Sequence, residues 1–206
     1  MSTTTTPTDT DLPEIVTSWL PRFIGLHGYA GVGKDTIAEI LKEYGYERVA
    51  FADKLREALY VLNPVILFDE TVHEEDGDFV RVQHIVDALG WDQAKRQYKE
   101  IRRMLQVLGT EVGREMIGQD VWVDATFKGL DKDKRYVFTD VRFENEHQAI
   151  DSQIGLLIKV ERPGVGPAND HKSEKPLPDK WFDAHINNNG TIEDLHTKVR
   201  EILARA

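Results

Sequence analysis

The sequence contains no cysteine among its 206 residues. Disulfide bonds and zinc sites with cysteine ligands are therefore excluded. An absence of cysteine is typical of proteins that work in a reducing compartment, so we expect a cytoplasmic location.

Positive charge is also scarce, because 26 Lys and Arg residues face 36 Asp and Glu residues and leave a net charge of −10. Proteins that bind nucleic acid need a basic surface, so we predict no nucleic-acid partner. If the ligand is a small anion, the chain must gather its cations locally.

Long apolar runs are missing as well, which argues against a membrane partner. The first ten residues are rich in Thr and lack the basic and apolar regions of a signal peptide, so we expect residues 1–18 to be a disordered lead-in. The remaining residues, 19–206, are predicted to form one α/β domain, since 40% of the chain is hydrophobic.

A glycine-rich stretch organises the chain. The apolar run 23–26 precedes Gly28-Tyr-Ala-Gly31-Val-Gly33-Lys34-Asp35-Thr36, and an amphipathic run follows. A strand, a glycine turn and a helix N-terminus in this order gather backbone N–H groups and a positive helix end around an anion. The spacing G-x-x-x-x-G-K is typical of a phosphate-binding loop, whose lysine reaches the outer phosphates.

One position departs from that pattern, because Asp35 stands where Ser or Thr usually binds magnesium. Thr36 cannot replace it, since successive helical residues project about 100° apart. We therefore predict that Asp35 lies on the magnesium side of the site, directly or through water. The alternative is a chance match, or a loop that no longer binds nucleotide.

Strand and helix patterns alternate along the chain, which predicts a three-layer α/β fold with a mainly parallel sheet and helices on both faces. A helix is expected over 34–44, a strand over 135–139, and a last helix capped by Thr191. Residues 63–100 read as an excursion from the sheet, with a helix from Phe79 that Gly90 breaks. Together with the irregular loop 163–180, this excursion is a candidate cover for the site.

Charged residues near the predicted strand ends supply further candidates. Asp53 and Arg56 follow the second strand, at the sheet edge where open α/β proteins bind ligands. The alternative for Asp53 is a helix N-cap. Asp140 follows a later strand and could support magnesium or the acceptor, or else cap the helix at 145–150.

A helix predicted over 101–109 carries Arg102 and Arg103, which is informative in so acidic a protein. Guanidinium groups hold and align the charge in phosphoryl transfer. The alternative is that these arginines pair with Glu100 or Glu111. Trp122, further on, could belong to the core or line a base pocket.

Several segments together resemble the phage-type deoxynucleoside monophosphate kinases, a branch of the P-loop nucleoside monophosphate kinases. The matching segments follow the expected order from residue 23 onward, and Asp35 is not anomalous in this family. They are 31–36 (GVGKDT), 51–53 (FAD), 102–111 (RRMLQVLGTE), 121–123 (VWV), 139–143 (TDVRF), 171–174 (HKSE) and 189–191 (NGT).

The resemblance implies a P-loop NTPase fold and transfer of the γ-phosphoryl group of ATP to a deoxynucleoside monophosphate (dNMP), with Mg²⁺ as cofactor. It implies catalytic roles for Lys34, Asp35 and Arg102, and magnesium contacts for Asp35 and Asp140. ATP would be held by Gly28, Gly31, Val32, Gly33, Lys34, Asp35 and Thr36. The acceptor would be bound by Asp53, Arg56, Arg102, Gln106, Gly109, Thr110, Trp122, Asp140 and Arg142.

Other readings remain open from the sequence. The loop segment Tyr29-Ala30-Gly31 lacks a basic side chain that related sequences can carry, so ATP contacts there would be mainly through the backbone. Rivals are another small-molecule kinase, of the dephospho-coenzyme A kinase or adenylate kinase kind, and a regulatory protein that binds ATP without transferring it. A homodimer, and the host cytoplasm for a phage-encoded chain, complete the expectations.

Overall fold

A computed structural model describes residues 19–68, 78–167 and 175–206 of the chain. The predicted lead-in 1–18, part of the acidic stretch near 69–77 and the segment 171–174 lie outside the described residues. The chain divides into two compact units, which we describe separately: residues 50–131 form the second, and the rest form the first. In the described ranges, no helix is both long and apolar enough to cross a membrane.

The first unit is built on a five-stranded sheet in the order β2-β5-β1-β6-β7, and each neighbouring pair is parallel. Its strands are β1 (Phe23–His27), β2 (Tyr46–Val49), β5 (Arg135–Val141), β6 (Leu156–Glu161) and β7 (Ala184–Asn187). Its helices are α2 (Lys34–Lys42), α7 (Glu144–Asp151), the 3₁₀ turn η3 (Asp179–Trp181) and α8 (Ile192–Leu203).

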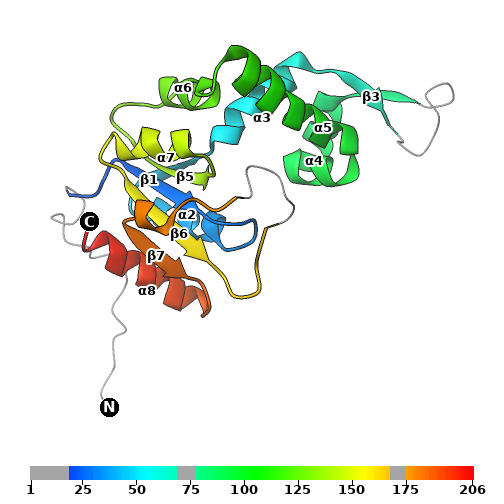
Figure 1. Cartoon of the computed structure of the whole chain (residues 1–206). Coiled ribbons are helices and arrows are strands. Elements are labelled where there is room, and N and C mark those ends of the chain that lie inside the picture. Colours follow the sequence, from blue (N-terminus) through cyan, green and yellow to red (C-terminus); the bar gives the residue numbers. More distant parts are fainter. Residues whose placement is uncertain (1–18, 69–77, 168–174) are drawn as a thin grey trace. The chain divides into compact units, whose positions relative to one another are not determined.

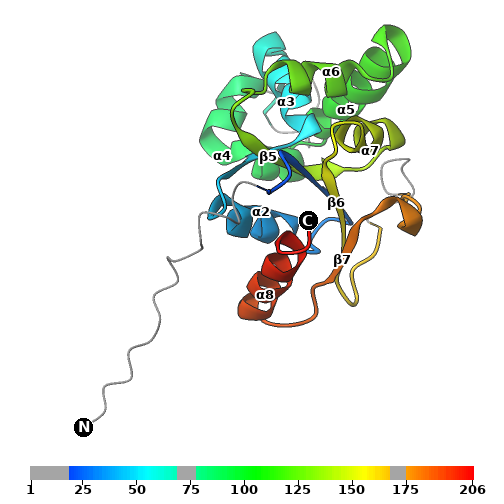
Figure 2. The ribbon, with the colours of Figure 1, turned by 90° about the vertical axis from the view of Figure 1, so that its left-hand side faces the viewer.

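Alternation along β1 sorts its side chains between the two faces of the sheet. Ile24 and Leu26 join the main core with α2 and α8. Gly25 faces the other side, where an added Cβ would lie 2.9 Å from the Cδ1 of Ile150 on α7. Helices therefore cover both faces of a parallel sheet (Figures 1 and 2), and the predicted three-layer α/β fold is confirmed.

The second unit is mainly helical. It contains α3 (Phe51–Leu62), β3 (Val65–Leu67), β4 (Phe79–Arg81), α4 (Val82–Gln97), α5 (Lys99–Val107), η1 (Leu108–Ile117) and α6 (Val121–Lys128). Leu59, Ile85 and Ile101 lie at the centre of its core. The helix predicted from Phe79 begins only at Val82, because 79–81 pair antiparallel with β3, whereas Gly90 interrupts α4 as expected with φ of 73°.

The segment η1 is a ten-residue π-helix, a rare conformation that occurs frequently at functional sites. The sequence pattern predicts only a helix ending at Gly109, because an apolar face does not distinguish i→i+4 from i→i+5 bonding. Gly113 allows this segment to meet α6 closely, since a Cβ there would lie 2.6 Å from the indole nitrogen of Trp122.

The last helix provides a test of the capping prediction. Thr191 caps α8 as expected, with its Oγ1 accepting a hydrogen bond of 3.2 Å from the Asp194 amide. We expect Thr191→Ala to lower the free energy of unfolding by about 1 kcal/mol in urea denaturation. Thr197→Ala is the matched control, because the Thr197 hydroxyl only bonds to the Glu193 carbonyl within the helix. An equal loss in both variants would contradict the capping role.

Candidate functional site

The glycine turn after β1 has the backbone that a phosphate-binding loop requires. Gly31 and Gly33 have φ of 85° and 105°, a region that favours glycine. At Gly28 an added Cβ would lie 2.2 Å from the carbonyl oxygen of Val160. Larger residues at these positions would force the loop out of its path.

Lys34 is the buried cation of this loop. The residue is only 9% exposed, and its Nζ donates hydrogen bonds of 2.7 Å to the carbonyls of Gly28 and Tyr29. Gly33, which precedes helix α2, provides no side-chain cap for the helix amides. An ammonium group and a helix N-terminus are therefore both directed at the space that the loop encloses.

The carboxylates proposed for magnesium lie in the same unit. Asp35 is exposed in the first turn of α2, and Asp140 is half-buried near the end of β5, the strand next to β1. Among the described residues no group of three or more His, Asp or Glu side chains could hold a metal ion. A magnesium site needs no such group, because Mg²⁺ usually takes one or two carboxylates and completes its shell with phosphates and water.

The structure corrects one alternative for Asp140. The strand β5 extends to Val141, so Asp140 lies within it rather than at a helix start. Helix α7 begins at Glu144, and Glu146 performs the capping by accepting bonds from the amides of Arg142 and Phe143. Asp140 is therefore not the N-cap of this helix, which is Phe143.

Two features of the loop's surroundings are not predicted by the sequence patterns. Asn188 follows β7 and donates a 2.9 Å hydrogen bond to the Val32 carbonyl. A cavity of about 250 Å³ opens beside the loop, lined by Tyr29, Val32, Glu161, Arg162, Pro163, Val165 and Asn187. Both depend on strands distant in sequence, and the only local signal is that these residues follow the ends of parallel strands.

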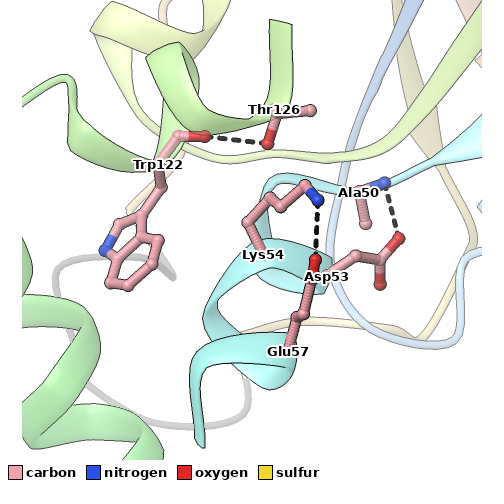
Figure 3. Close-up of polar contacts among 6 residues, drawn as sticks. All are labelled: Ala50, Asp53, Lys54, Glu57, Trp122 and Thr126. Carbon is pink, nitrogen blue, oxygen red and sulfur yellow. Dashed lines mark hydrogen bonds and ion pairs between the residues drawn. The ribbon is translucent and has the colours of Figure 1, made fainter. Parts of the chain in front are cut away.

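In the second unit, Asp53 and Arg56 interact with each other. The Asp53 carboxylate accepts a hydrogen bond of 2.9 Å from the Ala50 amide (Figure 3). It accepts a second one, also of 2.9 Å, from the Arg56 guanidinium. Since α3 begins at Phe51, Asp53 caps from the third helical position rather than as the N-cap itself. Lys54 pairs instead with Glu57, and their charged atoms lie 2.6 Å apart; this pair is also drawn in Figure 3.

The two neighbouring arginines of α5 behave differently. Arg103 pairs with Glu100 through two hydrogen bonds of 2.6 and 2.7 Å. These bonds are the main cause of the lowered pKa of the Glu100 carboxyl. Arg102 is exposed, and within the described ranges its guanidinium has no carboxylate partner. The predicted pairing alternative therefore holds for Arg103 and not for Arg102.

Trp122 holds the π-helix in place. Its indole N–H donates a 3.0 Å hydrogen bond to the carbonyl of Gly109, and its own carbonyl accepts a bond from Thr126 (Figure 3). Gln106 is exposed and Thr110 is half-buried, and both polar side chains lie within three residues of Gly109 in the sequence. The ring is half-buried, which fits neither a pure core residue nor a freely exposed one.

Comparison with known proteins assigns the family. The family described as "Deoxynucleotide monophosphate kinase" matches residues 62–199, more than half of the chain. The chain belongs to this family. This kinase is therefore a phosphotransferase with nucleotide substrates and ATP as the phosphoryl donor. The family match begins after the phosphate loop, so the loop and the match are independent observations.

Individual relatives agree with that assignment. A protein of Acanthamoeba polyphaga mimivirus, provisionally named a deoxynucleotide monophosphate kinase, is 29% identical over 197 residues, covering 85% of this chain and 93% of that one. A deoxynucleoside-5′-monophosphate kinase of Escherichia phage T5 is 26% identical over 77% of this chain and 86% of its own length. Among solved structures, a dephospho-CoA kinase from Campylobacter jejuni has a TM-score of 0.39 at 14% identity, covering 89% of this chain and 94% of that one; this likeness is too weak to support an argument.

Proposed function

We propose that this kinase transfers the γ-phosphoryl group of ATP to a deoxynucleoside 5′-monophosphate and releases ADP and the diphosphate. The observation that carries the proposal is the buried ammonium of Lys34 within a glycine loop, in a chain of this family. Residues 28, 31–33 and 36 then bind the ATP phosphates together with Lys34 and Asp35.

On the donor side, the chain supplies charge and orientation. The Lys34 ammonium and the uncapped amides of α2 neutralise phosphate oxygens as charge develops on them. The cavity beside the loop can take the base of ATP, because Tyr29 offers an aromatic ring and Arg162 a planar guanidinium for stacking. Tyr29 thus contributes to ATP binding although the loop lacks a basic side chain there.

Asp35 and Asp140 are the residues that would hold Mg²⁺, directly or through its water. A bound Mg²⁺ supplies charge neutralisation on the phosphate oxygens of ATP. Because only these two carboxylates of the chain are assigned to it, its remaining ligands would be phosphates and water.

On the acceptor side, Arg56, Arg102 and Arg142 neutralise the acceptor phosphate, and the protein needs no strong general base because that phosphate is largely ionised near pH 7. Arg102 is the catalytic member of this group, since a guanidinium matches phosphoryl oxygens in two-point geometry. The other acceptor contacts are assigned to Asp53, Gln106, Gly109, Thr110, Trp122 and Asp140.

An acceptor screen tests the proposal. ADP release is measured with each of the four dNMPs, their ribonucleotide counterparts and dephospho-coenzyme A, with ATP as the donor. We expect diphosphate product from at least one dNMP. Product from dephospho-coenzyme A alone would favour the rival kinase, and ATP binding without any product would favour a regulatory protein.

A homodimer, a lack of nucleic-acid partners and a cytoplasmic location stay predictions.

The magnesium role of Asp35 makes a separate prediction. We expect Asp35→Asn to raise the Mg²⁺ concentration needed for half-maximal turnover by about tenfold, because a neutral amide is a weaker ligand than a carboxylate. The measurement is a magnesium titration at fixed ATP, with Glu39→Gln on the outer face of the same helix as the control. A titration unchanged from the wild type would exclude both direct and water-bridged ligation.

A further inference from the structure

His27 is a buried polar residue at the end of β1, directly before the phosphate loop. Its side chain is 7% exposed, in a strand whose five residues are all buried. A polar group in such a position costs free energy unless its hydrogen-bonding atoms find partners. The site residues proposed above make no use of this imidazole.

Both ring nitrogens of His27 have partners. Nδ1 lies 2.8 Å from the Val141 carbonyl oxygen, and Nε2 accepts a 3.4 Å hydrogen bond from the Leu177 amide. One neutral tautomer satisfies both contacts, with the proton on Nδ1. Burial lowers the pKa of His27, the hydrogen bond to Val141 acts against this, and the nearby cations Lys159, Lys34 and Arg142 lower the pKa further.

The Leu177 amide begins a segment, residues 177–183, that we call the strap. Most of the strap is attached to the sheet and to α7 by other groups. Asp179 pairs with Lys159 at 2.6 Å, the Trp181 carbonyl lies 2.7 Å from Nε2 of His147, and the Asp183 carboxylate accepts a bond from the Leu157 amide. Phe182 stacks on the His27 ring at a centroid distance of 5.1 Å.

The start of the strap is attached to the sheet through His27. Within residues 175–178, as far as the structure describes their surroundings, the bond from Leu177 to His27 is the only hydrogen bond to the sheet. The imidazole thus links the strap to the carboxyl end of β5. The residue after it, Gly28, provides a carbonyl for the Lys34 ammonium. A shift of His27 would therefore be transmitted to the loop by a single peptide unit.

We propose that His27 is a positioning residue for the phosphate loop, which it holds in its ATP-binding geometry by bridging the strap and the end of β5. This inference rests on the proposed function only in taking ATP as the donor. It assigns the residue no contact with substrate. Its loss should weaken ATP binding without a matching loss of global stability.

The experiment compares two histidines that hold the same strap. His27→Phe keeps the ring that stacks on Phe182 and removes both hydrogen bonds, whereas His147→Phe removes only the contact with the Trp181 carbonyl. The readouts are the Kd of a fluorescent ATP analogue, the thermal midpoint and hydrogen exchange of the Leu177 amide. We expect His27→Phe to raise the Kd about tenfold, the equivalent of one or two lost hydrogen bonds, and to speed exchange at Leu177.

His147→Phe should leave the Kd within about twofold of the wild type. An unchanged Kd in His27→Phe, or an equal rise in both variants, would overturn the proposal. If His27→Phe does not fold, His27→Gln and His27→Asn replace it. Gln retains an acceptor near the position of Nε2 and should bind ATP more tightly than Asn, and equal affinities would count against the bridge. If the wild type instead forms no product from any dNMP, the proposed function is contradicted and the inference about His27 is not, because ATP binding is measured here without an acceptor.

Discussion

Replacing Arg102 by alanine is expected to lower turnover by about a hundredfold or more while ATP still binds. Arg102 is exposed on α5, next to the fully buried Ile101 in the sequence, and no carboxylate of the described residues holds it. Its guanidinium can therefore serve a phosphate without first breaking an ion pair. The measurements are kcat from ADP release and the Kd for ATP from a fluorescent analogue.

Arg103→Ala is the matched control for this experiment. Arg103 is adjacent in sequence and its side chain is 62% exposed, but it is engaged with Glu100. An exposed pair of this kind contributes little to stability, so we expect the control to change turnover by less than about threefold. Equal losses in the two variants would show a general charge effect, and unchanged turnover in Arg102→Ala would remove Arg102 from the mechanism.

The phosphate loop and the parallel sheet can be predicted from the sequence because their signals are local. Glycine spacing reports the positive φ of Gly31 and Gly33, and short apolar runs mark β1 and β6. The cap at Thr191 is local in the same sense, since the acceptor and donor are three residues apart. Such features depend little on the rest of the chain.

The features that sequence reasoning misses are those that depend on distant partners. The strand β4 exists because residues 79–81 meet β3, and its three residues alone cannot be distinguished from a helix start. The bond from Asn188 to Val32 spans 156 positions, and that from Leu177 to His27 spans 150. Sheet order brings such groups together, and no local pattern encodes the order β2-β5-β1-β6-β7.

The same distinction explains how far the site itself can be predicted. The loop residues are assigned by spacing alone, but the difference between Arg102 and Arg103 is visible only once Glu100 is placed beside one of them. Likewise the sequence offers capping as an alternative for both Asp53 and Asp140, and the contacts of the two helices decide it. Asp53 takes part in capping α3, whereas Glu146 takes that role in α7.

The second large effect is expected at Lys34. We expect Lys34→Met to lower turnover by about a thousandfold, because the ammonium is the buried cation of the loop and methionine keeps only its apolar stem. Lys34→Arg should rescue little, since a planar guanidinium does not fit a site where Nζ makes two bonds of 2.7 Å to adjacent carbonyls. The assay is kcat at saturating ATP and acceptor.

Lys42→Met at the other end of α2 is the matched control, because Lys42 is exposed and, among the residues that the structure describes, pairs only with Glu39. It should leave turnover within about twofold of the wild type, as expected for a surface ion pair. Since Lys34 also bonds the loop to itself, the thermal midpoint of each variant separates loss of charge from loss of structure. Turnover within tenfold of the wild type in a folded Lys34→Met protein would contradict the role of the ammonium in phosphoryl transfer, because neutralisation of the transferring group would then have to come from elsewhere.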